Sequence, residues 1–192
     1  MHKAIIFDFF GVIGHSTYQL VVRDIALSRT QKDELNDLHK ALDNGFIDTN
    51  EFLQRYAAIL QLEYAEFINR YYESLERFTT TPDMLAFVQQ LRKSYKVGLL
   101  SNVGAEGYFQ FIEPLVRNFD AVVASFQVQL AKPEVAIYEL MAAKLGVHPT
   151  ECIMIDDSET NCEGARAAGM EAIVFSDINA AKLGLRSLGI AI

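Results

Sequence analysis

The chain has 192 residues, of which 51% are hydrophobic and 22% charged, with 11 glycines and 4 prolines. This composition excludes disordered and fibrous proteins, because it offers enough apolar surface to bury the core of one domain. The formal net charge of −8 gives no overall attraction to nucleic acid or to anionic lipid. We therefore expect a small-molecule ligand rather than a nucleic-acid or membrane partner.

The sequence predicts neither a secretion signal nor a membrane span. The apolar stretch near the N-terminus is short and is interrupted by Asp8, so it does not resemble a signal peptide. No run of about eighteen uncharged apolar residues is present to cross a bilayer. Cys152 and Cys162 could form at most one disulfide, which is a poor framework for a chain this long. Reduced thiols in a cytoplasmic protein are the simpler interpretation.

Five short apolar runs separated by helical patterns predict a parallel sheet. Each run is continuously apolar, which suits a strand covered by helices on both faces. The runs are residues 4–7, 97–100, 121–123, 152–155 and 172–175. Between the later runs, Pro133 can begin a crossover helix that ends at Gly146, and Ser158 can cap another that stops at Gly169. The predicted fold class is α/β, with a Rossmann-like five-stranded parallel sheet.

The part of the chain between the first and second predicted strands shows helical spacing and lacks strand-like runs. Thr30 with Asp33, and Asp48 with Glu51, resemble capping pairs that begin two helices. The aromatic and aliphatic residues that follow recur at periods near 3.6. A block of helices at this place predicts an inserted helical cap. The expected division is a core of residues 1–14 and 81–192 and a cap of residues 15–80.

Polar side chains lie at the ends of the predicted strands, where ligands bind in open parallel sheets. Together they offer carboxylates, a hydroxyl, an amide and an ammonium group at one edge of the sheet. They are Asp8 after the first run, Ser101 and Asn102 after the second, Lys132 before the helix that leads to the fourth, and Asp156 and Asp157 after the fourth.

Four short segments resemble, in order, the motifs of the haloacid dehalogenase superfamily. They are residues 6–12 (IFDFFGV), 100–102 (LSN), 131–134 (AKPE) and 155–158 (IDDS). Any one of these motifs is weak, but four in this order over nearly the whole chain are specific. Within the superfamily, the chain is similar to small-cap sugar-phosphate phosphatases of the glucose-1-phosphate phosphatase type and to the phosphatase domain of soluble epoxide hydrolase.

This resemblance implies Mg²⁺-dependent hydrolysis of a small phosphorylated metabolite. Asp8 is then the nucleophile that forms an aspartyl-phosphate. Lys132 is a catalytic and substrate-binding cation that, with the metal, neutralises phosphate charge, and Ser101 and Asn102 donate hydrogen bonds to the phosphoryl oxygens. The implied metal ligands are the Asp8 carboxylate, the main-chain carbonyl of Phe10, Asp157 and, directly or through water, Asp156.

One position departs from the family pattern. Most phosphatases of the superfamily have a second Asp two residues after the nucleophile, which protonates the leaving oxygen and then activates water, whereas this chain has Phe10. General acid–base help is worth about 10²–10⁴ in rate, so the sequence predicts slow hydrolysis, best with activated phosphates. A catalytically impaired binding or interaction module is the alternative. A metal-independent 2-haloacid dehalogenase comes third, because Asp156 beside Asp157 is costly without a cation.

Each of these residues could also have a purely structural role. A carboxylate, serine or asparagine after a strand is commonly a turn residue or a helix cap, and a lysine before proline can be a solvated surface residue. Two further polar residues are interpreted as structural: Asn161, which we expect to order a turn rather than contact substrate, and His15, which begins the cap connection. The substrate and the oligomeric state stay open.

Overall fold

The structure is a computed structural model that describes residues 1–15 and 21–192. In these residues an all-parallel, five-stranded sheet has the order β3-β2-β1-β4-β5, with β1 at its centre. The strands are β1 (Ala4–Phe7), β2 (Lys96–Ser101), β3 (Ala121–Ala124), β4 (Cys152–Asp156) and β5 (Glu171–Val174). The predicted Rossmann-like α/β fold with five parallel strands is confirmed.

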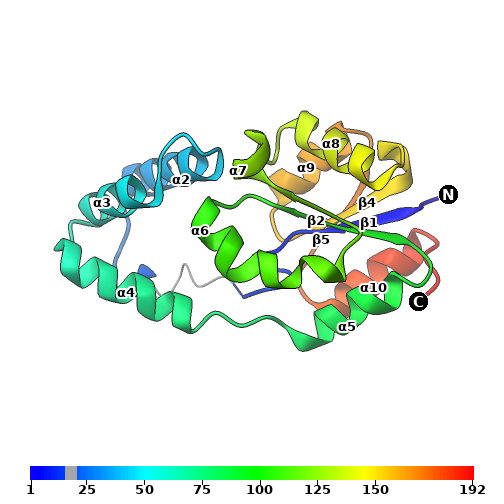
Figure 1. Ribbon diagram of the computed structural model, residues 1–192, viewed down its shortest axis with the longest axis horizontal. Coiled ribbons are helices and arrows are strands. Elements are labelled where there is room, and N and C mark those ends of the chain that lie inside the picture. The colour runs from blue at the N-terminus through cyan, green and yellow to red at the C-terminus, as the bar shows by residue number, and fades with distance from the viewer. Residues whose placement is uncertain (16–20) are drawn as a thin grey trace.

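Helices cover both faces of the sheet (Figure 1). They are α5 (Pro82–Leu91) and α10 (Ile178–Ser187) on one face, and α8 (Val135–Leu145) and α9 (Glu159–Ala167) on the other. Along β1, Ile5 and Phe7 belong to the first apolar core, while Ala4 and Ile6 belong to the second. Because successive side chains of a strand point to opposite faces, burial on both faces makes the strand apolar at every position.

Short helical segments complete the connections around the sheet. They are α6 (Ala105–Gly107), the π-helix η1 (Tyr108–Ile112), the 3₁₀ segments η2 (Glu113–Asn118) and η3 (Pro149–Glu151), and α7 (Ser125–Val128). The helix expected to begin at Pro133 begins two residues later, as α8, and ends at Gly146 as predicted. α9 packs tightly against the segment before α8, because an added Cβ on Gly164 would overlap with the Pro133 carbonyl. This contact holds the segment that carries the candidate lysine.

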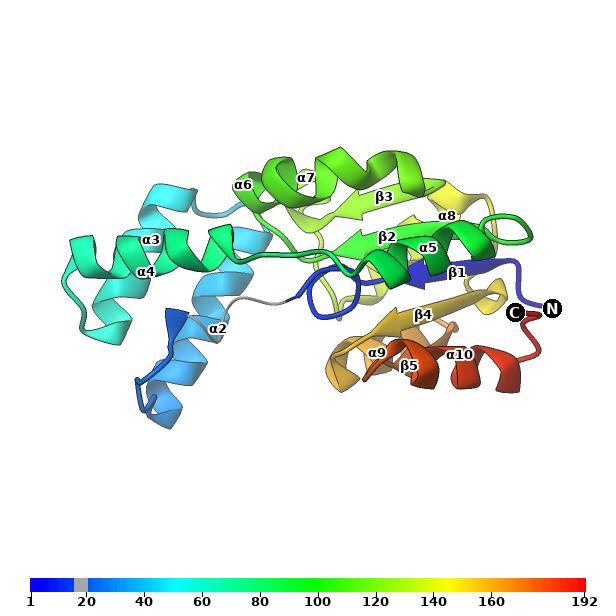
Figure 2. The ribbon, with the colours of Figure 1, turned by 90° about the horizontal axis from the view of Figure 1, so that it is seen from below.

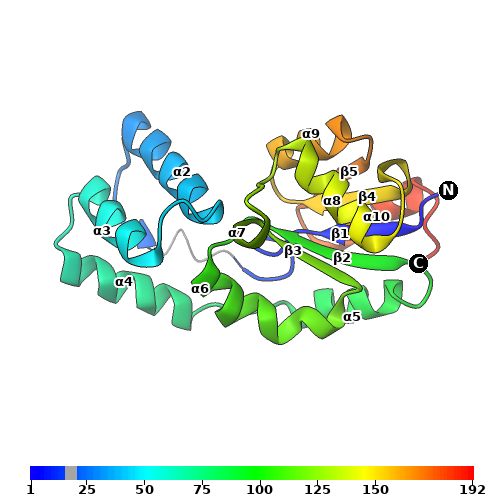
Figure 3. The same cartoon turned by 45° about the horizontal axis from the view of Figure 1, so that its top comes forward.

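Three helices between β1 and β2 lie beyond the carboxyl ends of the strands (Figures 2 and 3). They are α2 (Arg29–Asp43), α3 (Thr49–Leu60) and α4 (Tyr64–Glu76). They enclose a third apolar cluster of their own, separate from the two cores of the sheet. Residues 16–20, which the sequence assigned to the cap, lie outside the described residues. Within residues 1–15 and 21–192, no helix has both the length and the apolar character needed to cross a membrane.

The starts of α2 and α3 show which capping patterns form. Asp48 caps α3, as predicted, and its carboxylate accepts a hydrogen bond at 2.8 Å from the Glu51 N–H. The cap of α2 is Ser28 rather than the predicted Thr30. The Ser28 hydroxyl accepts from the Gln31 N–H, and the Gln31 side chain accepts from the Ser28 N–H. Ser28 is favoured over Thr30 as the cap because this reciprocal pair satisfies two backbone donors at once.

Candidate active site

A lysine lies between two carboxylates at the carboxyl ends of β1 and β4. The Nζ atom of Lys132 is 2.7 Å from Oδ1 of Asp8 and 2.6 Å from Oδ2 of Asp156. All three residues are buried, with exposed fractions of 5% for Lys132, 6% for Asp8 and 0% for Asp156. Charges are buried this deeply only when they are paired, since an isolated buried charge is very costly. A surface role for Lys132 is therefore excluded.

The ionisation of Asp8 depends on the cations around it. Burial raises the pKa of Asp8 to about 7, while the Lys132 ammonium opposes this rise and the charge of Asp156 adds to it. Burial lowers the pKa of Lys132, but its attraction to Asp8 and Asp156 outweighs that effect and leaves its pKa raised. Lys132 therefore stays protonated, and a second cation near Asp8 would favour the carboxylate that a nucleophile requires.

Asn102 fixes the backbone that carries Lys132. Its Oδ1 accepts a hydrogen bond from the Lys132 N–H at 2.8 Å, and its Nδ2 donates one to the Lys132 carbonyl at 2.9 Å. The second N–H of the Asn102 amide is not used in this pair. Ser101, the last residue of β2, is buried, and its hydroxyl makes a long contact of 3.5 Å to the Asn102 carbonyl. Both residues border the Lys132 segment.

Asp156 is held in place by the start of α9. Its Oδ1 accepts hydrogen bonds from the Ser158 N–H at 2.9 Å and from Asn161 Nδ2 at 3.0 Å. The Ser158 hydroxyl caps α9 as predicted. The sequence predicts that Asn161 orders a turn rather than contacting substrate, and in the structure its amide also orients the buried Asp156 carboxylate. The signal in the sequence was its position in the first turn of the helix that follows Asp156.

Three carboxylates form a set of hard oxygen donors. One oxygen from each of Asp8, Asp156 and Asp157 lies within 4.8 Å of the other two. Asp157 is exposed, and its carboxylate lies against Gly11, where an added Cβ would overlap with it. Gly11 has a φ of +87°, a conformation that favours glycine, so the loop after β1 can approach Asp157 closely. This donor set fits a small divalent cation such as Mg²⁺, which prefers carboxylate and carbonyl oxygens.

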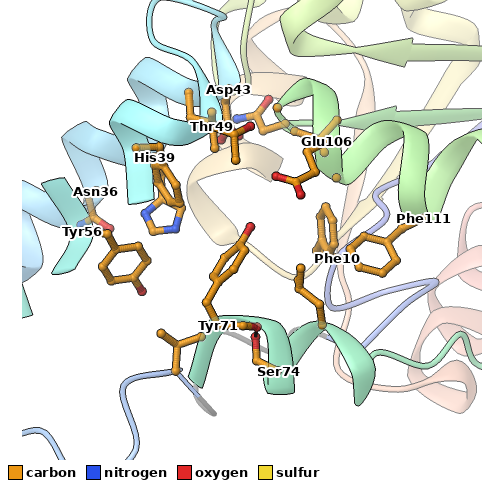
Figure 4. A pocket seen from close by; sticks show the side chains of 18 residues that line it. Phe10, Asn36, His39, Asp43, Thr49, Tyr56, Tyr71, Ser74, Glu106 and Phe111 are labelled. Carbon is orange, nitrogen blue, oxygen red and sulfur yellow. Dashed lines mark hydrogen bonds between the residues drawn. The ribbon is translucent and has the colours of Figure 1, made fainter. Parts of the chain in front are cut away.

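A cavity of about 400 Å³ lies between the sheet edge and the helices α2, α3 and α4, which are called the cap from here on (Figure 4). Its walls are mostly apolar and aromatic, with a few polar side chains among them. The side chain of Phe10 lines it and packs edge-on against Phe9, with ring centroids 4.9 Å apart. The cap contributes polar or aromatic side chains that are labelled in Figure 4: Asn36, His39, Asp43, Thr49, Tyr56, Tyr71 and Ser74. The cavity therefore borders the site on the side that faces the cap.

Asp43 is a cavity residue that the sequence did not single out. It is the last residue of α2, and burial raises its pKa to about 7, while Lys132 opposes this rise and Asp8 adds to it. The only sequence signal was an acidic residue at a helix C-terminus, where the helix dipole disfavours negative charge. That signal is weak because exposed acids also occur there.

The comparisons with known proteins agree with the motifs. A family model of haloacid dehalogenase-like hydrolases matches residues 2–169. The chain belongs to this family of hydrolases. Over 88% of its length it is 29% identical to Phosphatase MT3486 of Mycobacterium tuberculosis, and it covers 85% of that protein. It is 25% identical to D-ribitol-5-phosphate phosphatase of Bacteroides thetaiotaomicron, over 89% of this chain and 90% of the relative.

A solved structure shows the same fold. It is a haloacid dehalogenase family enzyme from Bacteroides thetaiotaomicron in complex with magnesium and inorganic phosphate. The two structures superpose with a TM-score of 0.70 at 21% identity, over 94% of this chain and 99% of the other. The chain is thus an enzyme of the hydrolase class, with phosphatases among its relatives of similar length.

The shared lysine gives a first testable prediction. Lys132→Met leaves Asp8 and Asp156 facing each other without a cation, and we expect it to lower the free energy of unfolding by about 3–5 kcal/mol at pH 8. The loss should be smaller at pH 5. Without Lys132 the folded-state pKa of Asp8 rises further above its ordinary value of 3.8, so the carboxyl is neutral in the folded protein at low pH and costs stability only as pH rises.

Urea denaturation in EDTA at the two pH values measures this effect. The matched control is Lys93→Met, which removes an exposed lysine and should change the free energy of unfolding by less than about 0.5 kcal/mol. A Lys132→Met protein as stable as the control at pH 8 would show that the buried lysine does not hold these carboxylates together.

Proposed function

We propose that the protein is a Mg²⁺-dependent phosphatase that hydrolyses small phosphomonoesters through an aspartyl-phosphate on Asp8. The observation that carries this proposal is the convergence of a buried nucleophile candidate, Asp8, with the Lys132 ammonium and the Asp156–Asp157 carboxylates. The magnesium and phosphate complex of the Bacteroides enzyme supports the same chemistry. The phosphatase relatives support it independently.

The residues proposed to hold Mg²⁺ surround the end of β1. They are the carboxylates of Asp8 and Asp157, the main-chain carbonyl of Phe10 and, directly or through water, Asp156. Gly11 brings the loop that contains Phe10 against Asp157, which supports a shared ligand set. When bound, Mg²⁺ supplies positive charge that offsets the charge of the phosphate and favours the ionised form of Asp8.

The protein groups have separate tasks in the first step. A carboxylate oxygen of Asp8 attacks phosphorus and forms the aspartyl-phosphate. The Lys132 ammonium has three N–H donors, two of which bond Asp8 and Asp156, so the third can bind a phosphoryl oxygen. Ser101 and the unused N–H of Asn102 are the other proposed donors to that group. Because Asn102 and Asp156 fix Lys132 before substrate binds, little reorganisation is needed.

The cavity indicates a small substrate whose leaving group faces the cap. Its volume of about 400 Å³ suits a phosphorylated metabolite of sugar-phosphate size rather than a macromolecule. A closed cap would exclude water during attack and readmit it for hydrolysis of the aspartyl-phosphate. We place this activity in the cytoplasm, which is consistent with two buried cysteines that form no disulfide.

Two alternatives make different predictions. A binding module that has lost catalysis is favoured by Phe10, which supplies no acid or base at its position. A 2-haloacid dehalogenase also needs no acid there, but it would use no metal, and the clustered carboxylates of Asp8, Asp156 and Asp157 argue against it.

The deciding assay measures phosphate release from a panel of phosphomonoesters with Mg²⁺. We expect the wild-type protein to hydrolyse at least one of them, and we expect Asp8→Asn or EDTA to reduce the rate to the background without enzyme. Equal trace rates in the wild-type protein and Asp8→Asn would support the binding module. Halide release from a 2-haloacid that persists in EDTA would support the dehalogenase.

Phe10→Asp tests the assignment of position 10. The new carboxyl would reach the cavity that Phe10 lines, and we expect it to raise kcat/KM for phenyl phosphate by up to about 10²-fold. The loss of aromatic packing on Phe9 and Phe78 should lower the melting temperature somewhat, so folding is checked by circular dichroism. An unchanged or lower rate in a folded variant would count against this assignment.

A further inference from the structure

The step that Phe10 leaves unassisted is the departure of the leaving oxygen. In the proposed phosphatase reaction, this oxygen gains negative charge as its bond to phosphorus breaks, and a proton donor lowers that barrier. The attacking and leaving oxygens lie roughly in line on opposite sides of phosphorus. Since Asp8 attacks from the end of β1, the leaving oxygen faces the cavity and the cap. A proton donor must therefore reach into this cavity.

Two carboxylic acids of the described residues line the cavity, Asp43 from α2 and Glu106 from α6 (Figure 4). The side chain of Asp43 makes no hydrogen bond or ion pair with another residue in the described part of the chain. Its backbone, by contrast, is fastened to the core, because the buried hydroxyl of Ser125 donates to the Asp43 carbonyl at 2.5 Å. The end of α2 is thus fixed over the site while the carboxyl stays available.

The charges of Lys132 and Asp8 affect the ionisation of Asp43. Burial raises the pKa of Asp43 to about 7, and the attraction of Lys132 and the repulsion of Asp8 act on the same carboxyl. A group with this pKa is partly protonated near neutral pH, so it can give a proton in one step and take one in the next. Asp43 also lines the same cavity as Phe10 and Asn102, and Asn102 bonds the backbone of Lys132.

The other titratable groups of the cavity fit this task less well. Glu106 lines the cavity from the short helix α6, beside Phe10 in Figure 4, and its charge adds to the burial that raises the pKa of Tyr71. The raised pKa of Tyr71 makes its hydroxyl a weak acid. Burial lowers the pKa of His39, and its Nδ1 atom lies 2.8 Å from the Leu35 carbonyl.

We propose that Asp43, at the end of α2, is the general acid and base of the reaction. It fills the role that the Phe10 side chain cannot fill, because Phe10 has no ionisable group. This inference rests on the proposed phosphatase function. The substrates that need this proton transfer are phosphomonoesters with an alkyl or unactivated aryl leaving group, and Asp43 would protonate their bridging oxygen.

The proposed steps balance in atoms and electrons. As the Asp8 oxygen bonds to phosphorus, the bond between phosphorus and the bridging oxygen breaks, its electron pair stays on that oxygen, and Asp43 gives the oxygen a proton. The alcohol then leaves. In the second step the Asp43 carboxylate takes a proton from water, the water oxygen bonds to phosphorus, and the bond from phosphorus to Asp8 breaks. Inorganic phosphate leaves, and both carboxyls return to their starting states.

The test compares two substrates that differ in their need for a proton. For Asp43→Asn we expect kcat/KM to fall by about 10²–10⁴-fold with phenyl phosphate and by less than about 10-fold with p-nitrophenyl phosphate, whose leaving group departs as a stable anion. Because the variant also lacks the base of the second step, p-nitrophenyl phosphate should give a burst of nitrophenolate followed by slow turnover.

The pH profile gives a readout that a purely structural role would not move. With phenyl phosphate, kcat/KM of the wild-type protein should decrease above about pH 7, as Asp43 loses its proton, and this decrease should be absent in Asp43→Asn. Asp43→Glu, which keeps an acid, should recover part of the rate. Phe10→Asp should increase the rate more in the Asp43→Asn background than in the wild-type background, because either carboxyl can serve.

Asp37→Asn is the matched control, since it removes an exposed acid from the same helix and should leave both kcat/KM values unchanged. An equal loss for the two substrates with an unchanged pH profile would overturn the role of Asp43 while leaving the phosphatase proposal intact. So would an unchanged rate in Asp43→Asn. Absence of phosphate release by the wild-type protein would instead overturn the proposed function, and the role of Asp43 with it.

Discussion

The ion contacts of Lys132 with Asp8 and Asp156 are the constraint on which the rest of the site depends. They join the loop after β1 to the end of β4, and these two strands are neighbours in the sheet. The lysine can reach both carboxylates because Asn102 holds its backbone and Gly164 lets α9 approach the segment that follows it. A parallel sheet with β1 at its centre thus brings residues that are far apart in sequence to one point.

This arrangement lowers the free energy of unfolding, but it keeps ionisable groups where the proposed reaction needs them. Burial raises the pKa of Asp8 and of Asp43 from 3.8 to about 7, so both carboxyls destabilise the folded state increasingly as pH rises from about 4 to about 7, and above that pH the cost stays constant. Uncharged residues at these positions would avoid that cost. Carboxyls kept at such positions are typical of acid–base or nucleophilic centres. The apolar walls of the cavity, including Phe10, strengthen the effect by keeping water away.

The sequence was most informative where a local pattern determines the structure. Continuous apolar runs predicted the parallel sheet, because both faces of its strands are buried, and polar residues at the strand ends predicted the cluster of Asp8, Lys132 and Asp156. It was least informative where distant segments meet. The position of Asp43 over the site depends on the docking of α2 onto Ser125, a contact between residues 82 positions apart that no local pattern encodes.

The most direct test of the account is a calorimetric titration of the wild-type protein and of Asp157→Asn with Mg²⁺. Asp157 is exposed, so its replacement should leave the fold and the Lys132 contacts unchanged while it removes one proposed ligand. The account predicts one Mg²⁺ site per chain in the wild-type protein and a greatly weakened site in the variant. No uptake by the wild-type protein, or equal affinity in the two proteins, would contradict it.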